Sequence, residues 1–297
     1  MSNNGINEYL GQLKRELAGG DSATVQDALS DAEEYLRNGV AQRLKDVPGL
    51  TESAALEHVV GEYGSPSEVA TAYKEIERRV SPSLAPASPT NGRSPAARFF
   101  GVFTDPRAYA SLFYMFFALA TGIFYFTWVT TGLSISAGLI VLIVGLPFLG
   151  LFLLSIRGIA LVEGRIVEAL LGVRMPRRPM FSSKHLGLWG RFKALFADRR
   201  SWLPMIYMVL QLPLGIFYFT LFVTMLCLGL AGLAVPVLQY GFGLPLGQFG
   251  DETYYAPAWV MPLIVIVGVL WLLVTMHLAK WLGGLHGRFA KAMLVKE

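Results

Sequence analysis

The hexapeptide Gly-Ile-Phe-Tyr-Phe-Thr occurs twice in the chain, at residues 122–127 and again at residues 215–220. Both copies lie inside long stretches that contain no charged side chain. The copies are 93 residues apart (215 − 122 = 93), and at the same spacing Tyr114 matches Tyr207. Over residues 105–127 the two copies share 11 identities in 23 positions. An internal repeat of this kind predicts a duplicated membrane unit.

The repeat resumes after an insertion, where Gly164-Arg165 matches Gly287-Arg288, and it divides the membrane half into residues 105–200 and 201–297. After Arg107 there are 49 consecutive uncharged residues, and a crossing of the bilayer needs about 20. Each copy is therefore expected to cross twice. The expected membrane helices are about 109–131, 134–156, 203–225 with an apolar extension to 238, and 258–278. The turn in the first copy is expected at residues 131–136, and an exterior loop in the second copy at 239–257.

The basic residues predict the orientation. They precede the first crossing, fill the segment around Lys184 and follow the last crossing, whereas the expected exterior segments contain none. By the positive-inside rule, both termini and the central segment are predicted to be cytoplasmic. Each copy is expected to end in an amphipathic helix at the inner interface, at 157–172 and 282–295, whose Arg165 and Arg288 contact lipid phosphates. The alternative is that these helices pack beneath the bundle.

Residues 1–79 are predicted to form a small cytoplasmic helical domain. Its second helix is expected to place Asp27 on the polar face, opposite an apolar one. Ser65-Pro66-Ser67-Glu68 predicts a capping box with proline at the first helical position, which opens a fourth helix. Residues 80–104, which begin with a stretch rich in proline, serine and alanine, are expected to be a flexible linker and membrane approach. The predicted fold class is all-α, a cytoplasmic helical domain plus a four-helix transmembrane domain of two tandem hairpin repeats.

The charge is divided unevenly between the two halves. Residues 1–80 carry 14 acidic and 8 basic side chains, net −6, and the rest carry 7 acidic and 17 basic, net +10, which together give the +4 of the chain. An acidic head without a basic stripe argues against direct binding to nucleic acid. Cys227 is the only cysteine, so an intrachain disulfide and a cysteine-based metal site are both excluded.

The sequence contains no motif that carries catalysis. A P-loop, a His-Glu-x-x-His pair, a nucleophile elbow and a dinucleotide-binding glycine motif are all missing, so neither an enzymatic activity nor a cofactor is predicted. His277 and His286 lie nine residues apart without carboxylate neighbours, which favours a place at the membrane interface over a metal site. The expected crossings contain no ionisable residue except His277 at one edge, and this argues against ion-coupled transport.

Two sets of residues are candidates for sensing. The first is the exterior loop, which holds the only charges expected outside and includes Asp251, Glu252, Tyr254 and Tyr255. The second consists of the repeated aromatic residues, which could line an apolar cleft, namely Phe124, Tyr125, Phe217 and Tyr218. Ordinary packing or an interfacial aromatic belt is the competing interpretation of these rings, and a loop without a role is the competing interpretation of the first set.

Two parts of the chain resemble known families. Tyr9-Leu10, the stretch 29–35 and the motif Tyr63-Gly-Ser-Pro-Ser-Glu-Val-Ala70 resemble the HAAS-type bacterial signalling domain. The run 212–220, the turn 144–147 and the segment 157–172 resemble the sensor domain of bacterial membrane proteins and of some sensor histidine kinases. The phospho-acceptor helix and nucleotide-binding domain of those kinases are not found in this sequence. The resemblance implies that a transcription regulator or kinase acts with the head.

Taken together, these features predict a multi-pass protein of the bacterial inner membrane. It is expected to be a sensor or regulatory protein without catalytic output, which relays a membrane or envelope signal through the cytoplasmic head to a partner protein. An oligomer is compatible with this expectation. The alternative function is a permease-like subunit, or one that handles lipids or other hydrophobic ligands.

Overall fold

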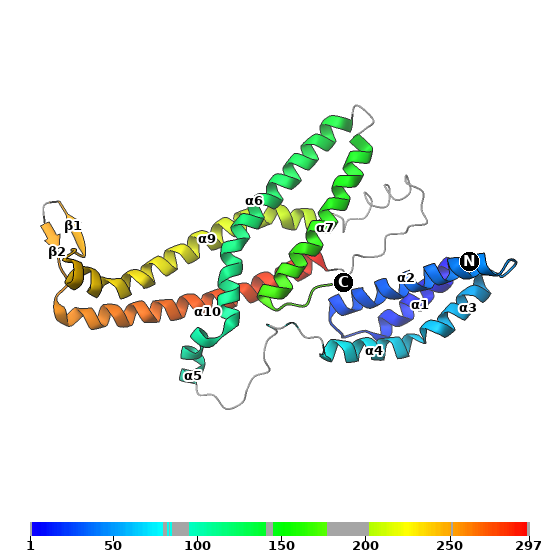
Figure 1. The fold of residues 1–297 in the computed structure, drawn as a ribbon, viewed down its shortest axis with the longest axis horizontal. Coiled ribbons are helices and arrows are strands. Elements are labelled where there is room, and N and C mark those ends of the chain that lie inside the picture. The colour runs from blue at the N-terminus through cyan, green and yellow to red at the C-terminus, as the bar shows by residue number, and fades with distance from the viewer. Residues whose placement is uncertain are drawn as a thin grey trace. The chain divides into compact units, whose positions relative to one another are not determined.

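The computed structural model describes residues 2–79, 82, 84, 95–140, 145–176, 202–250 and 252–295. Within these ranges the chain is almost entirely helical, which confirms the all-α fold class (Figure 1). The chain divides into two compact units, the first formed by residues 1–85, 131–207 and 288–297, and the second by residues 86–130 and 208–287. Of the expected linker, residues 80–104, the described part contains a short helix, α5 (Pro95–Phe100), and a 3-10 turn at Gly101–Thr104. The segment around Lys184 lies outside the described residues.

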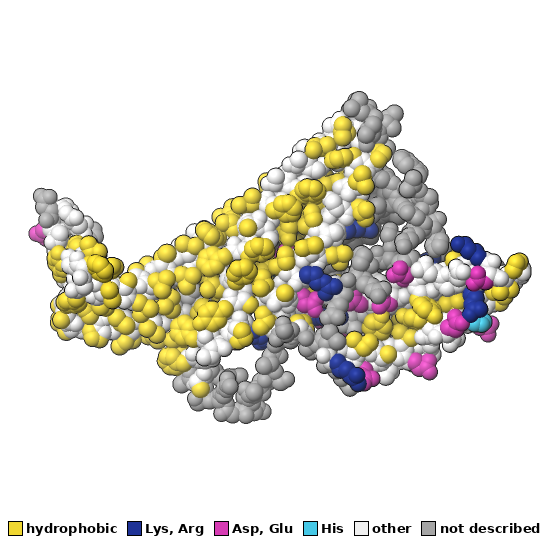
Figure 2. All heavy atoms as spheres, viewed as in Figure 1, with side chains coloured by type: hydrophobic (Ala, Val, Ile, Leu, Met, Phe, Trp, Pro, Cys, Tyr) yellow, Lys and Arg dark blue, Asp and Glu magenta, His cyan; other side chains and the backbone are white. Residues whose placement is uncertain are grey.

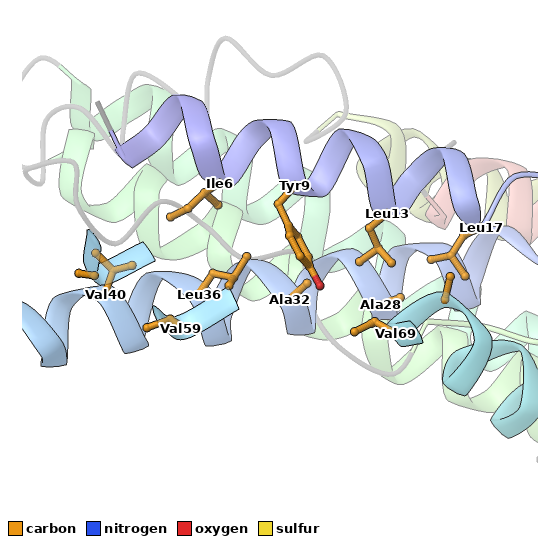
Figure 3. Packing of buried hydrophobic residues seen from close by; sticks show 12 residues of the cluster. Ile6, Tyr9, Leu13, Leu17, Ala28, Ala32, Leu36, Val40, Val59 and Val69 are labelled. Carbon is orange, nitrogen blue, oxygen red and sulfur yellow. The ribbon is translucent and has the colours of Figure 1, made fainter. Parts of the chain in front are cut away.

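The head is a four-helix domain with its own apolar core. Its helices are α1 (Ser2–Glu16), α2 (Ser22–Asp46), α3 (Glu52–Tyr63) and α4 (Pro66–Arg79). Leu13 of α1, Leu17 immediately after α1 and Leu36 of α2 are fully buried, and Figure 3 shows the side chains of α1 pointing toward α2. The short side chains of Ala28 and Ala32 on α2 complete this contact. The helical spacing of apolar residues in the sequence therefore becomes one contiguous core.

The predicted caps of the head are present. Ser65 and Glu68 form the reciprocal capping box: the Ser65 backbone N–H donates to Glu68 Oε2 at 2.8 Å, and the Glu68 backbone N–H donates to Ser65 Oγ at 3.4 Å. The Ser65 backbone N–H and the Ser65 hydroxyl, which also donates to Glu68 Oε2 at 2.8 Å, favour the charged carboxylate and hold the pKa of Glu68 below its ordinary value. The Thr51 side chain caps α3 through the Ala54 N–H, and Gly64 ends α3 with φ at 103°. Sequence-level capping rules thus fix the helix boundaries here.

Four helices among the described residues are long and apolar enough to cross a membrane. They are α6 (Pro106–Ile140), α7 (Gly145–Leu171), α9 (Leu203–Pro236) with a π-helical extension at Val237–Gly241, and α10 (Met261–Leu294), which follows a 3-10 turn at Ala258–Val260. Apolar side chains cover the membrane helices in Figure 2, whereas charged side chains gather on the head. The number of crossings agrees with the prediction, and the helices are longer than expected.

The expected helix boundaries are wrong in two places. The turn predicted at residues 131–136 lies within α6, which continues to Ile140. Its hydroxyl residues do not break the helix, because Thr130 and Ser136 donate back to the carbonyls of Phe126 and Gly132, at 2.7 and 2.6 Å. The two amphipathic helices predicted at 157–172 and 282–295 are not separate elements, since they continue α7 and α10 without interruption.

The connection between α9 and α10 contains a small β-hairpin that the sequence did not predict. Strands β1 (Gly247–Phe249) and β2 (Glu252–Tyr254) pair antiparallel, with Gly247 opposite Tyr254. The base of the hairpin is fixed by Gln239, whose buried side-chain amide donates to the Ala256 carbonyl at 2.7 Å and accepts from the Ala256 N–H at 2.9 Å. One side chain therefore satisfies both backbone groups of Ala256.

Within the second unit, α6 and α9 cross at the repeated hexapeptide. A Cβ atom on Gly122 would lie 2.7 Å from the Gln211 carbonyl oxygen, and a Cβ atom on Gly215 would lie 2.5 Å from the Ala118 carbonyl oxygen. Residues 118 and 211 are themselves one repeat apart (211 − 118 = 93), so the contact is reciprocal. The first residue of the hexapeptide is glycine in both copies because each helix backbone passes directly over the other at this position.

Candidate functional site

A buried polar cluster lies where α6, α9 and α10 meet in the second unit. His286 of α10 is buried, and both of its ring nitrogens contact tyrosine hydroxyls. Nε2 lies 2.7 Å from the hydroxyl of Tyr114 on α6, and Nδ1 lies 3.2 Å from the hydroxyl of Tyr218 on α9. The rings pack as well, with centroids 5.0 and 5.6 Å from the imidazole. Three helices are thus joined through one imidazole.

Gln211 extends this cluster along α9. Its side chain is fully buried, and its Nε2 donates to the Tyr114 hydroxyl at 3.3 Å. Its Oε1 is buried without a hydrogen-bond partner. A buried amide oxygen without a donor costs free energy, on the order of 1–3 kcal/mol. The cluster therefore has an unused acceptor next to the tyrosine that contacts the imidazole.

The first unit contains a matching pair. The hydroxyl of Tyr207 on α9 donates to Glu163 Oε1 on α7 at 2.8 Å, and both side chains are fully buried. The Tyr207 ring also packs on Phe289 of α10, with centroids 5.6 Å apart. Tyr207 matches Tyr114 at the repeat spacing of 93, and Glu163 matches His286 at the second spacing (286 − 163 = 123).

This equivalence means that the two polar pairs are one site present twice. In each pair, the tyrosine on the first helix of one repeat contacts an ionisable side chain near the end of the other repeat. One site has an imidazole and the other a carboxyl group. Each contact links the two repeats, so each can report a change in how they pack.

The expected position of His286 at the membrane interface is wrong, because the imidazole is almost completely buried. The expected crossings contain no ionisable residue except His277, but α7 and α10 extend beyond them, so Glu163 lies within α7 and His286 within α10. The signal was present in the sequence: Glu163 and His286 immediately precede the matched Gly-Arg pairs. His277 is partly exposed, and its Nε2 lies 3.0 Å from the Phe99 carbonyl oxygen.

The repeated aromatic residues separate into two kinds. Phe124 and Phe217 are 52% and 54% exposed, whereas Tyr125 and Tyr218 are only 3% and 6% exposed. The phenylalanines therefore lie on the outer surface of their helices, where lipid would contact them, and the tyrosines lie inside. Of the four, Tyr218 belongs to the histidine cluster.

The other candidate residues lie at the surface. Asp251 is outside the described residues, and Glu252, Tyr254 and Tyr255 are exposed on the hairpin. The Tyr254 hydroxyl donates to Glu252 Oε2 at 3.1 Å. Arg165 and Arg288 are both exposed near the ends of α7 and α10, and Arg165 lies 3.2 Å from Glu168.

The head is joined to the ends of α7 and α10 by charged side chains of the first unit. Gly172, with φ at 68°, ends α7, and Arg174 then contacts Glu168 at 3.3 Å and Asp27 of the head at 3.4 Å. Lys291 near the end of α10 donates to the carboxylate of Asp21, the N-cap of α2. Asp27 was expected on the polar face of α2, and the structure instead buries it, because Arg174 supplies a counter-charge.

A further ion pair fixes the start of α6 in the second unit. Lys280 Nζ donates to Asp105 Oδ2 at 2.5 Å, and the Arg107 N–H donates to Asp105 Oδ1 at 3.0 Å. Partial burial acts to raise the pKa of Asp105, but the hydrogen bonds from Lys280 and the Arg107 N–H, together with the charges of Lys280 and Arg107, outweigh it, so the pKa lies below its ordinary value. Among the residues that the structure describes, no group of three or more His, Cys, Asp or Glu side chains could hold a metal ion.

These observations define the class: an almost entirely helical chain with a helical head and four described helices long and apolar enough to cross a membrane. The family model described as "Putative sensor" matches residues 114–294, which is 181 of 297 residues (294 − 114 + 1 = 181), and the chain belongs to this family. The matched range includes Tyr114, Glu163, Tyr207 and His286. The head lies outside it. No curated protein and no solved structure gave a significant match.

Proposed function

We propose that this chain is a sensor or regulatory protein of the bacterial inner membrane, which relays a membrane or envelope signal through its helical head to a partner protein. The family match supports a sensor role for the membrane half. The single observation that carries the relay is the charged contact between α2 of the head and the ends of α7 and α10.

The geometry of this contact suits a relay. Asp21 caps the first turn of α2, and Asp27 lies within its first two turns. Both carboxylates are held by cations that directly follow or belong to membrane helices, so a shift of α7 or α10 would move charge away from the start of α2. Breaking a buried ion pair is costly because one charge stays uncompensated, so the head would respond to such a shift.

The partner is expected to act on the head. The resemblance of the head to HAAS-type signalling domains supports a transcription regulator or a kinase in this role. In the proposal the chain is not an enzyme, needs no cofactor and does not bind nucleic acid directly. Arg165 and Arg288 would contact lipid phosphates at the inner interface, because both are exposed beside the inner ends of their helices.

Charge removal tests the relay. In Arg174→Gln and Lys291→Gln, protection of the α2 amides from hydrogen exchange should fall, and the cellular response should approach that of a deletion of residues 1–80. Arg79→Gln is the matched control, because its partner Glu75 lies one turn earlier in the same helix and is exposed. Crosslinking of the head in cells would identify the partner. Unchanged exchange and an unchanged transcript profile in all variants would remove the basis for the relay.

The proposed orientation has its own test. In a Cys227→Ala background, single cysteines at Ser2, Lys184 and Thr253 can be labelled in intact spheroplasts with an impermeant maleimide. Thr253 lies on the exposed hairpin and should react, whereas the other two positions should react only after lysis. Labelling of Ser2 or Lys184 from outside would overturn the assignment of both termini to the cytoplasm.

The buried ionisable residues of the membrane half favour a test of the alternative, transport-related function. Proton and ion pathways use ionisable groups at membrane depth, and Glu163 and His286 are buried within helices of the membrane half. A permease-like subunit, or one that handles lipids or other hydrophobic ligands, would show flux or lipid transfer in reconstituted liposomes. A sensor would show neither.

A further inference from the structure

We propose that His286 is a proton-binding site inside the membrane helices, and that binding of one proton from water rearranges the hydrogen bonds among α6, α9 and α10. This inference does not depend on the relay through the head. It rests on the contacts of both ring nitrogens, on the unused oxygen of Gln211 and on the equivalence of His286 with Glu163.

The first step concerns the neutral imidazole. A neutral imidazole has one N–H donor and one acceptor nitrogen, and a tyrosine hydroxyl donates one hydrogen and accepts others. One tyrosine therefore donates to the bare nitrogen, and the other accepts from the N–H. In the tautomer that the proposal uses, the Tyr114 hydroxyl donates to Nε2 at 2.7 Å and the Tyr218 hydroxyl accepts from the Nδ1–H at 3.2 Å. The neutral ring is satisfied by the two hydroxyls.

The second step concerns the added proton. In the imidazolium both nitrogens donate, so both tyrosine oxygens must accept, and the hydrogen of Tyr114 needs a new acceptor. Gln211 Oε1 is a buried acceptor without a partner, and the amide lies 3.3 Å from the Tyr114 hydroxyl. Because the oxygen and nitrogen of an amide exchange places on a half-turn, Gln211 can accept that hydrogen. The added proton thus shifts an existing chain of hydrogen bonds and gives the Tyr114 hydrogen an acceptor.

The charges around the ring do not block this uptake. The titratable groups that face the imidazole are Tyr114 from α6 and Tyr218 from α9, both neutral as phenols. The charged residue nearest to it along α10 is Arg288, whose side chain is exposed. The equivalent position of the other repeat is Glu163, whose side chain is also ionisable and contacts the equivalent tyrosine.

The test measures protonation directly on the full chain in lipid nanodiscs. A His58→Gln, His185→Gln, His277→Gln variant leaves His286 as the only histidine and does not alter the cluster. With ¹⁵N-labelled histidine, the ring nitrogens should change from one bare and one protonated to two protonated between about pH 8 and about pH 4. Nitrogens that keep the neutral pattern throughout this range would overturn the proposal.

The role of Gln211 is tested in the same background. Gln211→Leu removes the acceptor that the protonated state needs, so half-protonation should require at least about threefold more hydronium. Gln248→Leu, on the exposed hairpin, is the matched control and should leave the midpoint unchanged. Tyr114→Phe should also shift the midpoint. If neither Gln211→Leu nor Tyr114→Phe moves it, the hydrogen-bond rearrangement is refuted even if the imidazole titrates.

Discussion

Alanine substitution of the repeated glycine should separate α6 from α9. A Cβ atom at Gly122 would lie 2.7 Å from the Gln211 carbonyl oxygen and 2.9 Å from the Leu212 Cα atom. At Gly215 the corresponding distances are 2.5 Å to the Ala118 oxygen and 2.8 Å to the Leu119 Cα atom. All four obstructing atoms belong to the backbone, so no change of rotamer can relieve the overlap.

The size of the effect follows from these distances. Ordinary contact begins near 3.4 Å, so the helices must move apart by about 0.7 Å for Gly122→Ala (3.4 − 2.7) and about 0.9 Å for Gly215→Ala (3.4 − 2.5). Overpacking of this kind typically costs about 1–3 kcal/mol in the free energy of unfolding. The double variant should cost less than the sum of the two, because both residues open the same crossing.

Gly138→Ala is the control for the change in helix propensity. Gly138 is exposed and lies on α6, as Gly122 does, and a Cβ atom there would meet nothing within 4 Å. Alanine favours the helix by about 1 kcal/mol relative to glycine at all three positions. The difference in unfolding free energy between each variant and Gly138→Ala therefore measures the cost of the overlap at the crossing. The assay is reversible unfolding in mixed detergent micelles, followed by circular dichroism. Values for Gly122→Ala and Gly215→Ala within about 0.5 kcal/mol of the control would refute the close crossing.

Three further predictions concern other parts of the chain. The pKa of Glu68 lies below its ordinary value, so the capping box stabilises α4 fully above the ordinary glutamate pKa and loses this effect as the pH falls through the lowered one. Hydrogen exchange of the α4 amides should show this acid-dependent loss, and Glu68→Gln should abolish it while the exposed Glu57→Gln should not. Leu36→Ala empties a fully buried site in the head and should cost about 2–5 kcal/mol, measured by thermal unfolding, against little change for the exposed Val47→Ala. Gln239→Leu leaves the buried backbone of Ala256 without its partners, so proteolysis between α9 and α10 should be faster than in Gln248→Leu.

Local features of the fold could be predicted from the sequence because each depends on neighbouring residues. The capping box at Ser65, the apolar face of α1 and the number of membrane crossings follow from spacing and side-chain type alone. The glycine that begins both hexapeptides can also be read from the sequence, but the sequence does not show why glycine is needed there. The reason is the crossing of α9 over α6, which joins residues 89 and 97 positions apart (211 − 122 = 89 and 215 − 118 = 97).

The remaining features depend on partners that are distant in sequence. Asp27 looked like an ordinary polar residue on α2 because its cation, Arg174, lies 147 residues away. His286 looked like an interfacial residue because Tyr114 lies 172 residues away, on another helix. The turn predicted at residues 131–136 is wrong for a local reason. The Ser136 hydroxyl donates to the Gly132 carbonyl of its own helix, so this polar residue does not end α6.

The two equivalent polar pairs differ in the sign of the charge that their ionisable group can carry. A carboxyl group is negative without its proton and neutral with it, whereas an imidazole is neutral without its proton and positive with it. Both sites keep the repeat-equivalent tyrosine, so the hydroxyl is the shared element and the ionisable group is the one that differs. The pair at Glu163 can carry a negative charge and the pair at His286 a positive one, so the two sites differ in the sign of their possible charge. A duplicated bundle with identical residues at these positions could not distinguish its two halves electrostatically, whereas this chain can.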